Sequence, residues 1–183
     1  MKLTSTPLPE LYIVDTLRQF DGRGSFSRLF CHNELTELLG ERKIAQINTS
    51  MTSQSGAIRG LHFQKKPAAE MKLVRCIRGE VFDVAVDLRL GSPTFLQWYG
   101  QILSAENAKM MVIPEGFAHG FQTQQADVEM LYIHTQFYAP EHEAGINFAD
   151  TQLNIAWLLP ITDVSDKDRN FPLLADDFKG IEI

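Results

Sequence analysis

The segment EVFDVAVDLRLGSP, residues 80–93, constrains the fold most strongly, because its apolar residues recur with the two-residue period of a β-strand. Every second side chain from Phe82 to Leu88 is apolar and falls on one face, while Asp83 and its alternate neighbours fall on the other. Gly79 before the segment and the Gly-Ser-Pro run at its end are turn residues. These features predict a strand held between two turns.

Similar short runs follow one another from about residue 45 to 140, separated by turn sequences such as SAEN and PEGFAHG. The run KLVRCI ends at Arg78-Gly79, which we expect to be a hairpin corner. The best helical candidate is residues 31–41, and one helical turn is expected near residues 150–157. Many short strands without alternating helices predict an antiparallel sandwich or barrel, with a ligand pocket at its mouth.

The bulk properties indicate one globular domain spanning residues 1–183, with 44% hydrophobic and 22% charged residues. The net charge of −6 argues against a broad surface for nucleic acid or for anionic membranes. No apolar run approaches the roughly 18 residues of a membrane span, and no signal-peptide core is evident, so we expect a cytoplasmic protein. Cys31 and Cys76 are expected to be free thiols, with a single disulfide left open.

His62, in the run RGLHFQ, is the first candidate for proton transfer. If residues 57–63 form a strand, His62 shares a face with Gly60, whose missing side chain leaves room for a ligand to approach. The alternative is a partly buried histidine that is satisfied by one hydrogen bond. The local pattern alone favours that alternative.

Three further polar residues can each be interpreted as either structural or functional. Lys72 lies on an apolar strand face, where it would either bind a ligand oxyanion or extend its amine to solvent from an edge strand. Tyr132 is either a core residue or a general acid whose hydroxyl faces a pocket. Asp168 lies in the polar run VSDKDRN, where a solvated carboxylate is the ordinary expectation.

His119 belongs to PEGFAHGF, which matches the P-x-G-x-x-H part of a cupin signature. Metal-binding cupins also need an H-x-H pair, and none occurs in this chain. Because a metal site needs at least three good ligands, we do not expect a bound metal.

Taken together, the runs RGLHFQ, KLVRCIRGEVFDVAVDLRLGSPTF, LSAEN, IPEGFAHGF, LYIHTQFYAPEHE and SDKD have a characteristic order and spacing. Over about residues 11–172 the chain resembles the dTDP-4-dehydrorhamnose 3,5-epimerase family. The resemblance implies an all-β cupin-type jelly-roll barrel with a few short helices, no metal and no cofactor. It also implies a homodimer in which N-terminal segments are shared between subunits.

The resemblance implies an isomerase acting on a nucleotide-linked 4-keto-6-deoxy sugar, converting dTDP-4-dehydro-6-deoxyglucose to dTDP-4-dehydrorhamnose. His62 matches the base that removes a proton beside the ketone, and Asp168 matches the carboxylate that orients it. Tyr132 matches the acid on the far side of the sugar ring. Lys72 matches the cation beside the developing enolate oxygen.

Ten further positions match substrate-binding residues of the family. They are Arg23 and Arg59 for the diphosphate, Phe26 and Tyr138 for the base, Gln46, Asn48, Glu143 and Lys167 for polar contacts, and Asp83 and His119 at the sugar end. Some of these residues can serve the neighbouring subunit of a dimer.

Two departures from the family pattern leave the substrate open. The family reads RGFFFES where this chain reads RGSFSRL, so Arg28 replaces a glutamate near the nucleotide. Glu70-Met71 replaces the usual Gln-Gly before the lysine. The nucleoside, the exact sugar and inversion at one carbon instead of two therefore stay open. A ketoisomerase, against which Tyr132 argues, and a non-catalytic sugar-binding cupin are the alternative functions.

One geometric conflict accompanies these assignments. Arg59 and His62 point to opposite faces of a regular strand, yet both are assigned to one ligand. Either the strand bulges at Gly60, or one of the two assignments is wrong.

Overall fold

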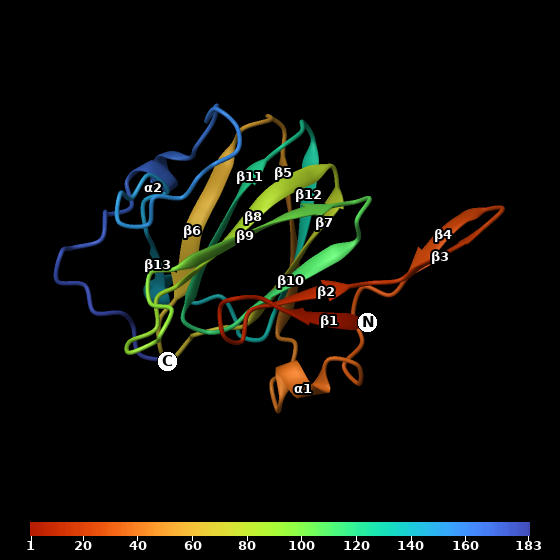
Figure 1. The fold of residues 1–183 in the computed structure, drawn as a ribbon, viewed down its shortest axis with the longest axis horizontal. Helices are drawn as coiled ribbons and strands as arrows, with labels where there is room; N and C mark the ends of the chain where they lie inside the picture. The colour runs from red at the N-terminus through yellow and green to blue at the C-terminus, as the bar shows by residue number, and fades with distance from the viewer.

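Short strands account for nearly all of the regular structure, which the computed structural model describes over residues 1–183 (Figure 1). The elements in chain order are β1 Lys2–Ser5, β2 Tyr12–Asp15, β3 Arg18–Asp21, β4 Gly24–Ser27, α1 Thr36–Leu39, β5 Gln46–Thr52, β6 Ile58–Gln64, β7 Lys72–Arg78, β8 Glu80–Asp87, β9 Trp98–Ser104, β10 Lys109–Ile113, β11 Phe117–Thr123, β12 Val128–His134, the 3₁₀ turn η1 Pro140–His142, β13 Glu143–Gly145 and α2 Asp166–Arg169.

Two antiparallel sheets form the body of the molecule. The six-stranded sheet has the order β1-β2-β10-β7-β12-β5, and the five-stranded sheet has the order β13-β6-β11-β8-β9. The chain changes sheet at nearly every connection between β5 and β12, as in a jelly roll (Figure 1). The predicted all-β jelly-roll fold is confirmed.

Strand β8 shows why this sequence forms two layers. Its side chains at Val81 and Ala85 join a 14-residue cluster that also contains Val74 of the other sheet. Its alternate side chains, Val84 and Val86 among them, join a second cluster on the outer side of the five-stranded sheet. Segments of the C-terminal third cover that outer side, so both faces of β8 are buried. The predicted two-residue alternation is therefore confirmed.

The expected hairpin at Arg78-Gly79 is wrong. Strands β7 and β8 lie in different sheets, so the chain turns at Gly79 to pass from one layer to the other. Gly79 has a φ of 76°, a left-handed conformation that glycine adopts without steric strain. The turn is present as expected, but local sequence does not distinguish a hairpin from a change of sheet.

The two expected helices differ in outcome. Within residues 31–41 only the single turn α1 is helical, and it ends at Gly40, which has a φ of 56°. Near residues 150–157 the chain forms turns and no helix. There the Asp150 carboxylate accepts the backbone N–H groups of Gln152 and Leu153, and a single turn closes with the Asn154 N–H on the Asp150 carbonyl.

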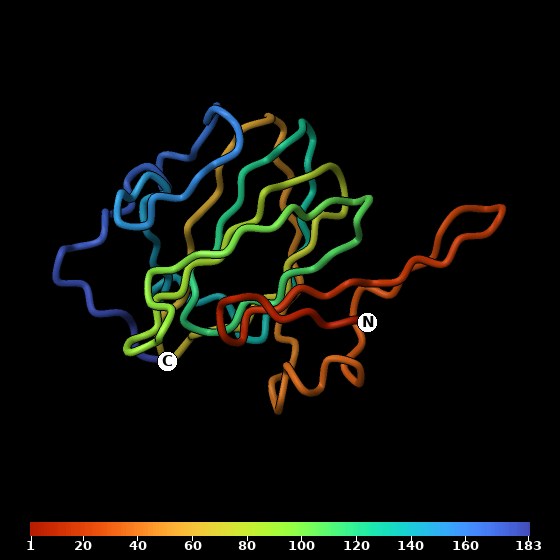
Figure 2. The backbone as a smooth tube through the Cα atoms, viewed as in Figure 1, coloured from red at the N-terminus to blue at the C-terminus, as the bar shows by residue number.

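A hairpin of β3 and β4, which we call the arm, extends away from the two sheets (Figure 1), and the backbone trace in Figure 2 shows it as a narrow projection near the N-terminus. Its aromatic side chains are largely exposed, Phe20 by 75% and Phe26 by 71%. Exposed aromatic residues on a projecting hairpin are typical of a segment that packs against another molecule.

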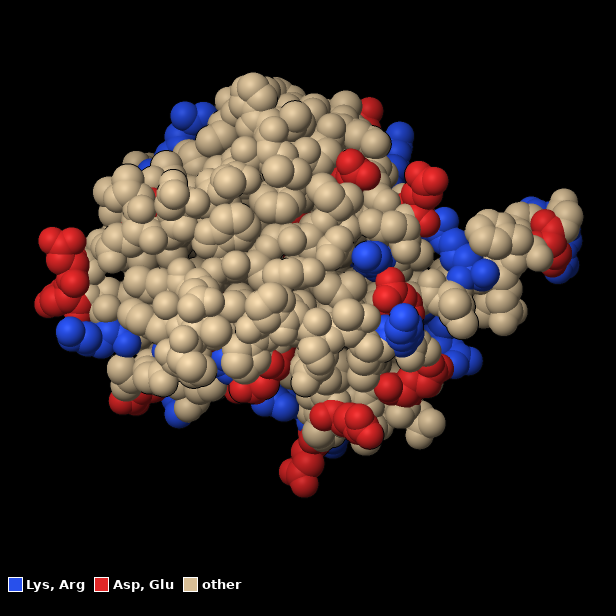
Figure 3. All heavy atoms as spheres, in the orientation of Figure 1, with Lys and Arg blue, Asp and Glu red and all other residues tan.

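Three other expectations concern the thiols, the surface charge and a membrane span. Cys31 and Cys76 are both free, as expected. Basic and acidic side chains are interspersed around the face shown in Figure 3, whose centre carries neither. None of the helices has the length and apolar character needed to cross a bilayer.

Candidate active site

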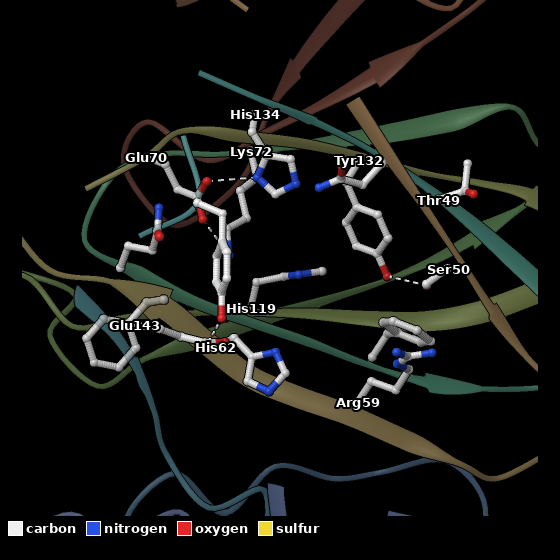
Figure 4. A pocket seen from close by; sticks show the side chains of 15 residues that line it. Thr49, Ser50, Arg59, His62, Glu70, Lys72, His119, Tyr132, His134 and Glu143 are labelled. Carbon is white, nitrogen blue, oxygen red and sulfur yellow. Dashed lines mark hydrogen bonds and ion pairs between the residues drawn. The ribbon is translucent and has the colours of Figure 1, made fainter. Parts of the chain in front are cut away.

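A cavity of about 280 Å³ opens between the two sheets and gathers most of the polar residues singled out above. In Figure 4 the side chains of β6 and β11 lie across the cavity from those of β7 and β12. The five-stranded sheet contributes Arg59, His62 and His119, and the six-stranded sheet contributes Asn48, Ser50, Lys72, Tyr132 and His134.

His62 is oriented by Asp168. Its Nε2 lies 2.7 Å from one carboxylate oxygen of Asp168, and the other oxygen accepts the Gly60 N–H at 3.0 Å. Because a carboxylate only accepts, Nε2 carries the hydrogen and Nδ1 is left as the basic atom. The Phe171 ring packs edge-on against the imidazole, with centroids 5.5 Å apart. A third of the His62 side chain remains exposed, so substrate can reach it.

Asp168 is only 3% exposed, contrary to the solvated loop that its local sequence indicates. It lies in α2, whose N-terminus is capped by the Ser165 hydroxyl accepting the Asp168 N–H at 3.1 Å. Burial raises the pKa of the carboxyl, but the hydrogen bonds from His62 and Gly60 outweigh burial and hold the pKa below its usual range. Asp168 is therefore a carboxylate at neutral pH.

A bulge at Gly60 resolves the conflict between Arg59 and His62. His62 pairs with His119 on β11, but Arg59 pairs with Phe121, so β6 contains one extra residue over this interval. The bulge turns Arg59 toward the same cavity as His62. This confirms the bulge alternative.

The missing side chain of Gly60 makes room for the neighbouring strand β11 and not for a ligand. A Cβ at this position would lie 2.6 Å from the Cα of Gly120 and 2.7 Å from the carbonyl oxygen of His119. The clearance that the sequence indicated is therefore filled by the backbone of β11. The φ of 120° at Gly60 also disfavours any other residue there.

Tyr132 faces the cavity from the opposite sheet. Its hydroxyl lies 2.8 Å from the Ser50 hydroxyl on the neighbouring strand β5. Its ring lies edge-on to His119, with centroids 6.4 Å apart. Burial raises the pKa of Tyr132 to about 12, although the Ser50 hydrogen bond opposes that shift. The phenol therefore keeps its proton at neutral pH.

Lys72 also faces the cavity from this sheet, and it is only 9% exposed. Strand β7 is an interior strand between β10 and β12, so the alternative of an edge-strand lysine reaching solvent is wrong. The ammonium nitrogen lies 3.1 Å from a carboxylate oxygen of Glu70. One carboxylate therefore compensates for the burial of this charge.

Four of the expected binding residues form a connected group at one end of the site. Glu143 accepts the Tyr138 hydroxyl at 2.8 Å and the Lys167 ammonium at 2.7 Å. The Gln46 side-chain oxygen accepts the Tyr138 N–H at 2.9 Å. Burial raises the pKa of Glu143, but the hydrogen bonds from Lys167 and Tyr138 outweigh burial and hold the pKa below its usual range. This carboxyl is therefore ionised at neutral pH.

A second cavity, of about 550 Å³, adjoins the first through shared walls at Arg59 and His62. Lys167 and Asp168 line its other side. The Arg59 guanidinium donates only to the Met51 carbonyl and the Thr52 hydroxyl and pairs with no carboxylate. Together the two cavities give an extended site with an unpaired cation at the junction.

Two expected binding residues lie outside these cavities. Arg23 and Phe26 are on the arm, where the Arg23 guanidinium pairs with Asp21 at 2.6 Å. Within one chain, neither side chain reaches the cavity that holds His62. The reason is the direction of the arm, which carries both residues away from the sheets (Figure 2).

The expectation that Asp83 faces the sugar end of the pocket is also wrong. Asp83 is fully buried behind His119, whose Nε2 lies 2.8 Å from one of its oxygens. Its other oxygen has no hydrogen-bond partner. Burial raises the pKa of this carboxyl above its usual range. His119 itself lines the cavity as expected.

Glu70 and His134 also line the cavity, although sequence reasoning gave neither of them a role in the site. The two-residue period does place His134 on the same face as Tyr132, and Glu70 departs from the family pattern at the entry to the sugar pocket. The three cavity histidines do not form a metal-ligand cluster, and no group of three His, Cys, Asp or Glu side chains does so. Each is bonded instead to its own carboxylate, as His62–Asp168, His119–Asp83 and His134–Glu70.

Known proteins match this chain over nearly its whole length. A sequence profile described as dTDP-4-dehydrorhamnose 3,5-epimerase matches residues 5–176. A dTDP-4-dehydrorhamnose 3,5-epimerase of Shigella flexneri is 43% identical over 171 residues, which cover 93% of this chain and 94% of that protein.

Solved structures show the same relationship. The dTDP-6-deoxy-D-glucose-3,5-epimerase of Legionella pneumophila, in complex with dTDP-4-keto-L-rhamnose, is 42% identical with a TM-score of 0.92, covering 100% of this chain and 98% of that one. A 3'-monoepimerase of Streptomyces bikiniensis, in complex with dTDP-quinovose, is 30% identical with a TM-score of 0.86, covering 92% and 85%. The chain therefore belongs to the dTDP-4-dehydrorhamnose 3,5-epimerase family.

Proposed function

We propose that this protein is an epimerase that inverts C3 and C5 of a dTDP-linked 4-keto-6-deoxy sugar, yielding dTDP-4-dehydrorhamnose. The observation that carries the proposal is the placement of His62 and Tyr132 on opposite sheets, facing one cavity that also holds Lys72. Inversion needs proton transfer at both faces of a carbon, because a single base returning its own proton only exchanges hydrogen. The relatives with this family name support the same activity.

His62 is the proposed base. The C4 ketone acidifies the hydrogens on C3 and C5, and Nδ1 removes one of them while the C–H electron pair moves onto the C4 oxygen as an enolate. The Asp168 carboxylate holds the required tautomer and stabilises the imidazolium that forms. General base catalysis of this kind contributes about 10²- to 10⁴-fold in rate.

Lys72 is the proposed partner of the enolate oxygen. Its ammonium has three N–H donors, and Glu70 occupies one of them. A fixed cation in a partly dry cavity stabilises developing negative charge more strongly than water does. Lys72 therefore lowers the barrier to proton removal without taking up a proton itself.

Tyr132 is the proposed acid. With a pKa raised to about 12 by burial, the phenol is protonated at neutral pH yet still a strong enough acid for an enolate carbon. It donates its proton to the carbon from the face opposite His62, and the enolate electron pair forms the new C–H bond. Proton exchange with solvent then restores both side chains.

The second cavity is the proposed nucleotide site. Arg59 stands at the junction of the two cavities without a carboxylate partner, which suits a diphosphate between sugar and nucleoside. Lys167 also lines this second cavity, whereas Asn48, Tyr138 and Glu143 line the first. Lys167 and Tyr138 are joined through Glu143, and Gln46 accepts the Tyr138 N–H, so this group is proposed to supply polar and aromatic contacts to the substrate. Thymidine is the proposed nucleoside, because the similar enzymes are named for dTDP-sugars.

A homodimer is part of the same proposal. On the edge strand β5 the outward side chains of Ile47 and Met51 are 60% and 56% exposed, an apolar face suited to a second copy. In such a dimer the arm would carry Arg23 and Phe26 toward a neighbouring site. Measurement of the mass in solution, before and after deletion of the arm, tests this arrangement. The cytoplasmic location likewise remains a prediction.

Deuterium incorporation tests the activity directly. The protein is incubated with dTDP-4-dehydro-6-deoxyglucose in deuterated water, and the label is located by NMR. Label with inversion at both C3 and C5 is expected. Label at C3 alone would indicate a 3'-monoepimerase activity, like that of the Streptomyces bikiniensis protein. No exchange at either carbon would refute the proposal that this protein is an epimerase.

A further inference from the structure

Glu70 forms a carboxylate bridge between two residues of the cavity wall. One oxygen lies 3.1 Å from the Lys72 ammonium, and the other lies 2.8 Å from Nδ1 of His134. Burial raises the pKa of Glu70, but the His134 hydrogen bond and the Lys72 charge outweigh it and lower the pKa overall. Glu70 is therefore ionised, and both of its neighbours are donors.

This bridge sets the tautomer of His134. A carboxylate only accepts hydrogen bonds, so Nδ1 carries the hydrogen and Nε2 of the neutral ring is an acceptor. The ring stacks on Tyr132 with centroids 6.1 Å apart and an interplanar angle of 23°. No protein group is hydrogen-bonded to Nε2, and His134 lines the cavity (Figure 4). The free acceptor is thus available to a ligand.

The position of Nε2 of His134 indicates which group of the sugar it would contact. His134 lies directly opposite Lys72 in the register of β12 and β7, and Lys72 is assigned to the C4 oxygen. In a 4-keto-6-deoxy sugar, C3 carries a hydroxyl, whereas C5 carries a methyl group and the ring oxygen. The hydroxyl adjacent to the ketone is therefore the one at C3.

We propose that His134, oriented by Glu70, is an additional substrate-binding residue whose Nε2 accepts a hydrogen bond from the C3 hydroxyl. This inference rests on the proposed function and adds a specificity-determining contact to it. Glu70 is a positioning residue, because it acts through His134 and Lys72.

A cycle of two substrates and two proteins tests the contact. The second substrate is the 3-deoxy analogue of the dTDP-4-keto sugar, and the measured step is deuterium exchange at C5, which both compounds undergo. Wild type is expected to prefer the 3-hydroxy compound by about tenfold in kcat/KM, the effect of one hydrogen bond. In His134→Phe, which keeps an aromatic ring against Tyr132, the preference should fall to within about twofold.

Two further variants separate this contact from a structural role. His134→Gln, which retains an acceptor, should restore part of the preference, whereas His32→Phe, the same change at an exposed histidine, should leave it unchanged. An equal preference in wild type and His134→Phe, or no preference in wild type, would overturn the inference. If wild type exchanges neither substrate, the proposed function itself fails, which is a different result.

Discussion

Two histidine–carboxylate pairs lie side by side on β6 and β11, yet their surroundings differ. His62 and His119 are cross-strand partners, and each imidazole bonds one aspartate at nearly the same distance, 2.7 and 2.8 Å. Asp168 accepts two hydrogen bonds, whereas Asp83 accepts one and leaves an oxygen unpaired. The first imidazole is 33% exposed and the second is 6% exposed.

This difference explains how the same pair of residue types can have two roles. Hydrogen bonds hold the pKa of Asp168 low, while burial raises that of Asp83. The Asp168 carboxylate orients an accessible ring, and substrate can reach that ring. The buried and incompletely satisfied Asp83 carboxyl holds an enclosed ring, that of His119, in place. Local hydrogen bonding and exposure, not residue identity, separate the two pairs.

The largest expected effect comes from Asp168→Asn. The amide oxygen must face the Gly60 N–H, so the amide nitrogen faces His62 and favours the tautomer with Nε2 unprotonated. The basic nitrogen then points away from the substrate, and kcat should fall by about 10²- to 10³-fold. Steady-state kinetics check this value, with Asp83→Asn as the matched control at the other pair. An equal loss of kcat in both variants would contradict the proposed difference between the two histidine–carboxylate pairs.

Stability should change in opposite directions at the two carboxylates. At neutral pH, Asp168→Asn should lower the free energy of unfolding by about 1–3 kcal/mol, because two hydrogen bonds to a carboxylate become weaker bonds of a neutral amide and His62 has to change its tautomer. Asp83→Asn removes a poorly satisfied buried acid and should leave stability unchanged or raise it by up to about 1 kcal/mol. Urea unfolding measures both. A loss above about 1 kcal/mol in Asp83→Asn would contradict this expectation.

The smallest expected effect is the pH dependence of these differences. The pKa of Asp168 is lowered by folding, so its contribution is present above the unfolded pKa and is lost as pH falls through the folded pKa. The pKa of Asp83 is raised, so its ionisation destabilises the fold above the raised pKa, and this penalty disappears as pH falls. The difference between Asp83→Asn and wild type should therefore shrink as pH falls towards about 4, whereas the difference for Asp168→Asn should persist to about pH 4 and shrink only below it. Unfolding curves from pH 7 to about pH 3 check this order, and two differences that stay constant over that range would contradict it.

The parts of this site that alternate along a strand were predictable from the sequence. The two-residue period placed Tyr132 and Lys72 on faces shared with apolar residues, and the conflict between Arg59 and His62 left a bulge at Gly60 as one of two alternatives, which the register of β6 and β11 decides. The same period places Asp83 beside Val81 and Ala85, two residues of the core between the sheets, so the pattern also contained a signal for its burial.

Other parts depend on contacts that no local pattern contains. Asp168 reaches His62 across 106 residues of sequence, and only the resemblance to a family pointed to that contact. The crossing of the chain between sheets at Gly79 depends on which strands pair, which tertiary packing decides. Arg23 and Phe26 are exposed on the arm, away from both cavities. Their expected role in substrate binding therefore depends on a second chain.

The most direct test of the central claim compares His62→Ala with Tyr132→Phe in deuterated water. The two side chains face the same cavity from opposite sheets, so the two variants should lose different steps of the reaction. His62→Ala should abolish exchange at C3 and C5, whereas Tyr132→Phe should retain exchange while losing inversion. Equal loss of exchange and inversion in both variants would contradict the assignment of a base and an acid to opposite faces of the sugar.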